Sequence, residues 1–190
     1  MALLVLSPQV AKAHLVTSGL GPFYDGALHL AISPDDLLGL LAVTLLAGLC
    51  GARAGRLTVI VLPLAWFVAG LAGLHLPANI YMPWLSILSF LVLGILVAID
   101  PKLPPNGVVT LAVLFGGVHG LFNGSALAAI GAGPLALSGI AVTVLVTAIL
   151  VSAFVVSMRS AWARIAVRVT GSWVAAVGML MFGWMMRGAV

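Results

Sequence analysis

The chain has 190 residues, of which 63% are hydrophobic and 6% are charged. A soluble domain of this size cannot bury so much apolar surface, so the composition indicates a polytopic membrane protein and excludes a soluble globular one. The formal net charge of +4 comes from basic residues in short connections. Such residues are typical membrane-topology signals and do not indicate nucleic-acid binding. Cys50 is the single cysteine, which excludes an intrachain disulfide and a cysteine-based zinc site.

The N-terminal residues 1–13 are apolar and end in Ala-Lys-Ala, the small–x–small form of a signal-peptidase site. We interpret them either as the remnant of a signal peptide or as an apolar N-terminal segment. Residues 14–190 are then expected to form a single transmembrane domain. Cleavage after residue 13 would make His14 the N-terminal residue, and its free amine and imidazole would together chelate a metal. His14 is therefore included among the candidate metal ligands.

Residues 19–32 contain too much glycine and proline for an ordinary spanning helix, yet they are too apolar for a solvated loop. We expect a short helix that lies at the outer surface or dips into the bundle, with His29 on it. Residues 33–36, Ser-Pro-Asp-Asp, are typical of a helix start. The serine suits the N-cap, the proline the first helical position, and the acids complement the helix dipole. This structural role alone would account for Asp35 and Asp36.

The remaining sequence divides into apolar stretches that are long enough to cross a bilayer, which takes roughly 20 residues. The expected fold class is all-α, a polytopic membrane helix bundle of about six transmembrane helices preceded by the short broken or interfacial segment. The predicted spans are, approximately, 35–50, 57–74, 83–99, 108–130, 135–158 and 167–186.

The basic residues are distributed unevenly over the predicted connections. Those after the first, third and fifth spans hold Arg53, Arg56, Lys102, Arg159, Arg164 and Arg168. Because positive charge favours the cytoplasmic side, both termini are expected outside a bacterial inner membrane. This orientation places His14, His29, Asp35 and Asp36 at the outer end of the bundle.

The fourth predicted span carries a polar pair near its middle. His119 is an ionisable residue near the middle of the membrane, where placing such a side chain costs free energy. A residue of this kind marks a functional site by default. Asn123 lies four residues further on and shares its helix face. Gly116, Gly120 and Gly124 form a neighbouring strip that lets a second helix approach closely. The alternative is an interhelical hydrogen-bonding pair with no further function, worth about 0.6 kcal/mol per contact.

One hypothesis joins the polar residues of both regions into a path for a divalent transition-metal ion. His29, Asp35 and Asp36 would capture the ion at the outer end, and His119 with Asn123 would form the step at the membrane midplane. Imidazole suits nickel, cobalt, copper and zinc, while carboxylates attract cations. A few mixed ligands also fit a conducting site, which must release the ion again. Neither haem nor a nucleotide is expected.

Two motifs resemble those of the HupE/UreJ family. Residues 26–38, GALHLAISPDDLL, are similar to the G-x-x-H-P-x-x-G-x-D-H-L-L motif that opens the first helix of that family. Residues 117–124, GVHGLFNG, resemble its second signature, H-G-x-A-H-G. These are membrane accessory proteins of hydrogenase and urease systems, regarded as nickel and sometimes cobalt permeases. Asp36 and Asn123 stand where the family has histidine, and such oxygen ligands weaken nickel binding relative to harder ions.

The resemblance implies a membrane permease or metal-binding accessory protein, and no enzyme. Its ion would be nickel or cobalt first, with copper and zinc behind them, delivered for metalloenzyme maturation. The expected partners are the lipid bilayer and the metal ion, with a larger membrane complex or a homo-oligomer as further options. The alternative function is a small integral subunit that packs against a larger membrane complex without transporting anything.

Overall fold

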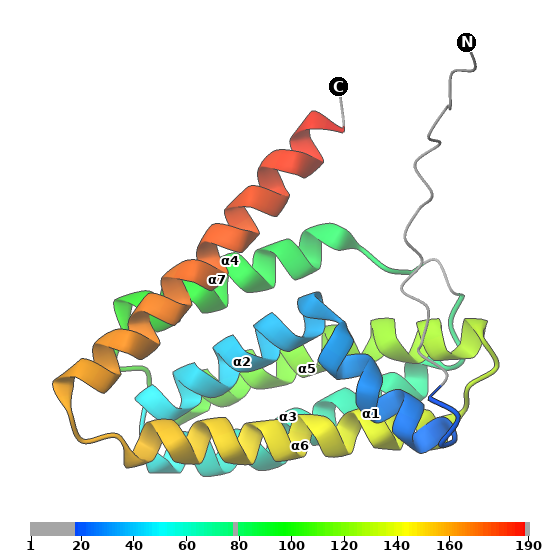
Figure 1. The fold of residues 1–190 in the computed structure, drawn as a ribbon, viewed down its shortest axis with the longest axis horizontal. Helices are drawn as coiled ribbons and strands as arrows, with labels where there is room; N and C mark the ends of the chain where they lie inside the picture. The colour runs from blue at the N-terminus through cyan, green and yellow to red at the C-terminus, as the bar shows by residue number, and fades with distance from the viewer. Residues whose placement is uncertain (1–17, 78–79, 189–190) are drawn as a thin grey trace.

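The computed structural model describes residues 18–77 and 80–188, and within these ranges the chain forms α-helices and no strands. Figure 1 shows their arrangement. The helices are α1 (Pro22–Ile32), α2 (Pro34–Leu49), α3 (Ala52–Gly73), α4 (Pro83–Ile99), α5 (Pro105–Ala129), α6 (Pro134–Ser157) and α7 (Ala161–Arg187). The all-α prediction is thus confirmed for the described residues. Residues 1–13 and the candidate ligand His14 lie outside them.

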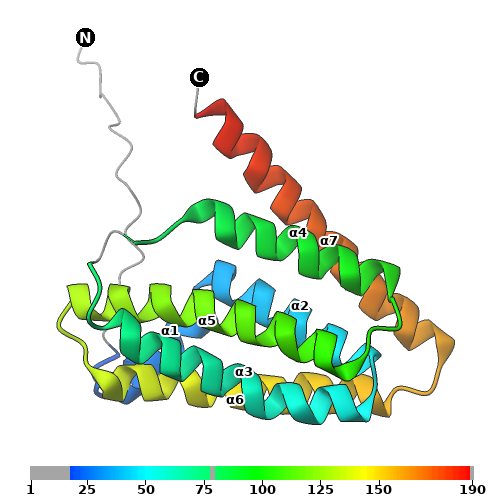
Figure 2. The same cartoon turned by 180° about the vertical axis from the view of Figure 1, so that it is seen from behind.

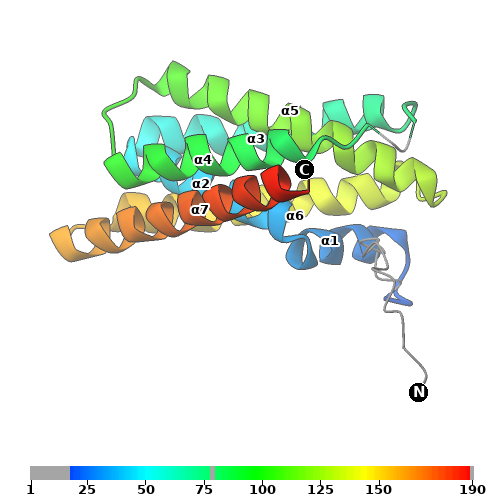
Figure 3. The same ribbon diagram turned by 90° about the horizontal axis from the view of Figure 1, so that it is seen from above.

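The helices form a body of five and a separate pair. In the body, α3 packs along α5 and α6, α1 packs on α6, and α2 lies between α6 and the pair of α4 and α7. Figure 2 shows α4 and α7 together on one side of the body. Viewed from above, helices α3 to α7 follow roughly the same long axis (Figure 3).

The lengths of the helices support a membrane-spanning bundle. Helices α3, α5, α6 and α7 are each long and apolar enough to cross a membrane. Helices α1 and α2 meet the same criterion only as a pair, which is bent by 75° at its break. Helix α4 is apolar but has 17 residues. At 1.5 Å per residue this is about 26 Å, somewhat less than the hydrocarbon core of about 30 Å. Each of the six predicted stretches is helical, and four or five spans satisfy the length criterion.

The break between α1 and α2 follows from the sequence at Ser33 and Pro34. Ser33 has extended backbone angles (φ −97°, ψ 94°) and precedes the first residue of α2. The ring of a proline disfavours helical geometry in the residue before it and removes a backbone donor. Ser33 occupies the expected N-cap position, but its side chain makes no capping hydrogen bond. The hydroxyl lies beside the ring of His29 instead, at 3.3 and 3.5 Å from the two ring nitrogens.

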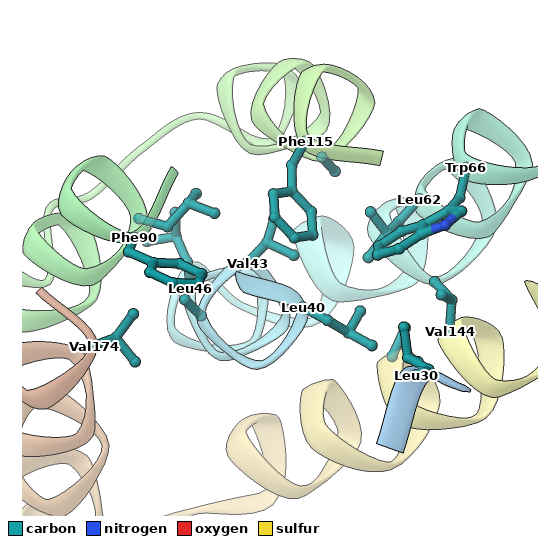
Figure 4. Packing of buried hydrophobic residues seen from close by; sticks show 14 of the residues in the cluster. Leu30, Leu40, Val43, Leu46, Leu62, Trp66, Phe90, Phe115, Val144 and Val174 are labelled. Carbon is teal, nitrogen blue, oxygen red and sulfur yellow. The ribbon is translucent and has the colours of Figure 1, made fainter. Parts of the chain in front are cut away.

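Helix α2 forms the centre of the apolar core, and most of its residues are buried. Figure 4 shows its side chains between the aromatic groups of the neighbouring helices. The labelled residues are Leu40, Val43 and Leu46 of α2, Leu30 of α1, Leu62 and Trp66 of α3, Phe90 of α4, Phe115 of α5, Val144 of α6 and Val174 of α7. The burial of α2 among its neighbours fixes the position of its first turn, which carries Asp36.

Helices α3 and α5 approach closely along the glycine strip of α5. A Cβ atom added to Gly116 would lie 2.9 Å from the carbonyl oxygen of Leu62. A Cβ on Gly120 or Gly124 would overlap the carbonyl oxygen of Trp66 or Gly70, respectively. Only glycine permits this backbone approach. The tight contact also fixes the rotation of α5, and with it the direction of its polar residues.

Helix α7 begins earlier than the sequence indicated. The Ser160 hydroxyl accepts a hydrogen bond from the backbone N–H of Ala163 at 3.2 Å, so it caps a helix that starts at Ala161. Arg164 and Arg168, which we expected in the connection, therefore lie on the first turns of α7. Arginine is compatible with a membrane-helix end because its long side chain reaches polar partners beyond the apolar region.

Two tryptophans mark the ends of α7. Trp162 is 80% exposed and Trp184 is 78% exposed. Their separation along the helix is about 33 Å at 1.5 Å per residue. This matches the distance between the two interfaces of a bilayer, where tryptophan is enriched. The spacing supports a membrane-spanning orientation of α7.

Candidate functional site

The polar cluster is centred on Asp36 in the first turn of α2. Asp36 is 3% exposed, and each of its carboxylate oxygens has a partner on α5. Nδ1 of His119 lies 2.6 Å from Oδ1, and Nδ2 of Asn123 donates to Oδ2 at 2.9 Å. A carboxylate is an acceptor, so the Nδ1 proton of His119 donates to it. The structure thus brings together three of the residues that the sequence singled out.

His29 reaches the same cluster from α1. The bend between α1 and α2 places its Nε2 atom 3.9 Å from Oδ2 of Asp36. His29 is 7% exposed, and the Ser33 hydroxyl is its nearest hydrogen-bonding group. The cluster therefore combines side chains of α1, α2 and α5. Its fourth member depends on the break at Pro34.

Asp35 lies apart from the cluster, on its outer rim. Its Oδ2 atom accepts a hydrogen bond from the Tyr81 hydroxyl at 3.4 Å. The Tyr81 ring packs edge-on against Phe122, with ring centroids 5.3 Å apart. Partial burial raises the pKa of the Tyr81 phenol, and the charge of Asp35 acts in the same direction. The phenol therefore stays protonated and can donate at neutral pH.

Sequence reasoning did not single out Tyr81. It precedes α4 in the connection between the predicted spans 57–74 and 83–99, and it lies 46 positions from Asp35. An aromatic residue at a membrane interface is common. Its sequence context therefore carries no signal for this contact.

Two buried polar atoms of the cluster have no hydrogen-bond partner among the described residues. They are Nε2 of His119 and Oδ1 of Asn123. Leaving a buried polar group unpaired costs about 1–3 kcal/mol. Since Nδ1 of His119 and Nδ2 of Asn123 are already committed to Asp36, both remaining atoms present lone pairs. The site thus presents the lone pairs of one nitrogen and one oxygen atom, which a metal ion can accept.

Aromatic side chains surround His119 and keep its environment apolar. The ring centroids of Phe115, Trp66 and Phe122 lie 4.2, 5.8 and 6.4 Å from that of His119. His119 itself is 1% exposed. In such surroundings a charge interaction is stronger than in water, and an unpaired polar atom is more costly.

The cluster is not a closed metal cage. Over the described residues, no group of three or more histidine, cysteine, aspartate or glutamate side chains is arranged to share a metal ion. The carboxylate of Asp36 is occupied by side-chain hydrogen bonds, and Asp35 is turned toward Tyr81. The geometry is that of an open, partial ligand set.

In a comparison with protein families, the chain matches the family model described as HupE / UreJ protein over residues 2–181. The matched range contains α1 to α6 and most of α7, and thus every residue of the cluster. No curated protein and no solved structure matches the chain.

Proposed function

The chain belongs to the HupE/UreJ family, and from that premise we propose that it is a permease for a divalent transition-metal ion. Nickel and cobalt are the first candidates for the ion, which would supply metalloenzyme maturation. The protein acts as a carrier and not as an enzyme. The observation that carries this proposal is the pair of buried, unpartnered donor atoms, Nε2 of His119 and Oδ1 of Asn123.

The arrangement around His119 supports a metal-binding role for its Nε2 atom. A histidine that ligates a metal commonly donates its other ring N–H to a carboxylate, which fixes the ring and raises its basicity. Asp36 stands in that relation to His119, at 2.6 Å from Nδ1. We therefore assign to Asp36 the role of an orienting and charge-balancing group, and not that of a capturing ligand.

The small number of protein ligands suits passage of the metal ion better than its storage. Nickel and cobalt accept imidazole nitrogen together with oxygen ligands. Two protein donors leave most of the coordination shell to water, so the ion is held weakly enough to leave. Asp35, on the rim, attracts the ion toward the site by its charge, and His29 offers a further imidazole nitrogen. A closed set of four ligands would retain it.

In this proposal the chain crosses the inner membrane six times and has both termini outside. Support comes from the position of the basic residues, because the connections that follow α2, α4 and α6 lie at one end of the bundle (Figure 1). The bend between α1 and α2 lies near the middle of the bundle, and α1 runs from it toward the opposite end (Figure 1). The ion would therefore enter from the outside, beside Asp35, and leave toward the basic end.

Metal uptake by cells and metal content of the purified protein test the proposal together. We expect His119→Gln and Asn123→Ala to lose most nickel and cobalt uptake and to purify with less metal than the wild type. The matched controls are His75→Gln and Asn106→Ala, which change exposed residues of the same types. Unchanged uptake and metal content in His119→Gln, at equal abundance in the membrane, would refute the proposed function.

A second candidate function is that of a small subunit in a larger membrane complex, without transport. The C-terminal half of α7 supports it, because it diverges from α4 (Figures 1 and 2) and exposes 71% of Leu180. Purification in mild detergent separates the two functions. A stoichiometric large partner together with the absence of bound metal would favour the subunit.

A further inference from the structure

An apolar crevice runs between α4 and α5 and ends at His119. It has a volume of about 290 Å³, and its walls include Leu88 and Val92 of α4 and Leu114 and Val118 of α5. The crevice exists because α4 packs on α7 and α2, whereas α5 packs on α3. A displacement of α4 relative to α5 would therefore widen or close it beside His119.

The pair of α4 and α7 is firmly attached at the end where α4 finishes and α7 starts. The guanidinium of Arg164 donates to both carboxylate oxygens of Asp100, with Nη2 at 2.7 Å from Oδ1. It also donates to the carbonyl oxygen of Leu49 at the end of α2, at 3.4 Å. Arg168 donates to the carbonyl oxygen of Ala98 at 2.8 Å. Charge-assisted, two-pronged bonds of this type fix geometry well.

The opposite end of the pair, its free end, is joined to the body by fewer side-chain hydrogen bonds, although Ile87 and Phe90 of α4 are buried there. Among the described residues, the contact from Tyr81 to Asp35, at 3.4 Å, is the only side-chain hydrogen bond that joins the start of α4 to α2. The Tyr81 ring also rests on Phe122, which in turn lies beside His119. Tyr81 thus connects the free end of the pair to the rim and to the wall of the site.

Ser86 lies near the Tyr81 hydroxyl. The Ser86 hydroxyl is fully buried on the first turn of α4 and has no hydrogen-bond partner among the described residues. It lies close enough to the Tyr81 phenol to influence the pKa of that group. When the phenol leaves Asp35, Ser86 can take it up at little cost in hydrogen bonding.

We propose that Tyr81 is a latch that holds the free end of α4 and α7 over the site, and that a cation bound at Asp35 releases it. A divalent cation competes for the carboxylate oxygen, because its attraction to a carboxylate exceeds that of a neutral phenol. The pair then turns about its Asp100–Arg164 end, and the α4–α5 crevice beside His119 opens. Tyr81 is a positioning residue in this scheme, which rests on the proposed metal-carrying function.

The width of the crevice is measured directly with a cysteine placed in its wall. Ser89 lines the crevice and is half-buried, so Ser89→Cys in a Cys50→Ser background reports its opening through the rate of alkylation by N-ethylmaleimide in detergent. Ser138→Cys on α6, also half-buried but outside the crevice, is the control. Tyr81→Phe removes only the hydroxyl and keeps the ring against Phe122.

We expect Ni²⁺ to raise the alkylation rate at position 89 several-fold in the protein with Tyr81. In Tyr81→Phe the rate should already be high without metal and should not respond to Ni²⁺, while position 138 stays unchanged throughout. Equal metal-free rates with and without the Tyr81 hydroxyl would overturn the latch. The latch would also be overturned if Ni²⁺ left the alkylation rate at position 89 unchanged in the protein with Tyr81, once elemental analysis has verified that nickel is bound. Because bound nickel is measured separately, a failure of metal binding is distinguished from a failure of the latch.

Discussion

The Asp36 carboxylate and the His119 imidazole lie 2.6 Å apart, although 83 positions separate them in the sequence. Both are almost fully buried, and the opposite ring nitrogen of His119 has no partner. A hydrogen bond at Nδ1 fixes the tautomer in which Nε2 carries a lone pair. The contact between α2 and α5 therefore determines the chemistry of the site.

The first prediction concerns the charge of Asp36. Asp36→Asn keeps the size of the side chain but removes the negative charge that balances a cation at Nε2 of His119. Groups that orient a metal-bound histidine typically contribute about 10–100-fold to metal affinity, so we expect a loss of that order. Titration of the purified protein with Ni²⁺ measures it.

Asp35→Asn is the control for this change. Asp35 neighbours Asp36 in sequence but contacts Tyr81 and not His119. We expect Asp35→Asn to lower the rate of ion uptake. It should reduce the nickel affinity of the purified protein less than Asp36→Asn does. Equal losses of affinity in the two variants would contradict the separate roles of rim and cluster.

The second prediction concerns the packing of α3 on α5. In Gly120→Ala, the added methyl group would overlap the carbonyl oxygen of Trp66. Overpacking of this kind lowers the free energy of unfolding by about 1–3 kcal/mol. It also displaces His119, the residue that precedes Gly120. We expect a lower midpoint of thermal unfolding in detergent, together with weaker metal binding.

Gly117→Ala is the matched control, because a Cβ at Gly117 has no atom within 4 Å. Both glycines lie on α5, and both substitutions raise helix propensity equally. The stability of Gly117→Ala should equal or slightly exceed that of the wild type. A similar loss of thermal stability in both variants would show that the close approach of α3 to α5 does not cause it.

The sequence was sufficient for the existence of the helices and for one half of the site. Four-residue spacing placed His119 and Asn123 on one face, and Ser33-Pro34 indicated the start of α2. The partner of His119 could not be inferred, because Asp36 has a complete local explanation as an acid in a first helical turn. Its burial against α5 depends on packing between helices that are distant in sequence.

The rim of the site and the start of α7 were missed for similar reasons. Tyr81 has the ordinary context of an interfacial aromatic residue, and its contact with Asp35 is long-range. The charges of Arg164 and Arg168 indicated a connection, since hydropathy alone does not account for arginines that find partners such as Asp100 and the carbonyl of Ala98. Local sequence patterns thus predict helices better than they predict the contacts between helices.

The third prediction concerns orientation in the membrane. Cys50 follows α2 directly and is half-buried at the end of the bundle that carries the basic connections. With that end in the cytoplasm, a membrane-impermeant maleimide should leave Cys50 unmodified in intact cells and modify it after permeabilisation. His75→Cys in a Cys50→Ser background, at the opposite end, should react in intact cells. The reverse pattern would contradict the proposed orientation.

The last prediction separates the attachment of α4 and α7 from metal binding. Arg164→Lys keeps the positive charge but cannot form two parallel hydrogen bonds to Asp100, because an ammonium lacks the planar fork of a guanidinium. It also loses the contact with Leu49. The Arg164 side chain is half-exposed, and lysine keeps a positive charge beside Asp100, so the protein should still fold. Since Arg164 lies far along the chain from the cluster and contacts none of its members, nickel affinity should be unchanged.

Uptake should nevertheless fall in this variant, because the pair of α4 and α7 would no longer turn about a fixed end. Arg187→Lys, on the last turn of α7, is the control for the same exchange at a site outside this contact. Nickel titration and initial uptake rates, measured on both variants at equal abundance, test the separation. A parallel loss of affinity and uptake in Arg164→Lys would indicate general disturbance of the fold, whereas wild-type uptake would show that the Asp100–Arg164 contact is dispensable for transport.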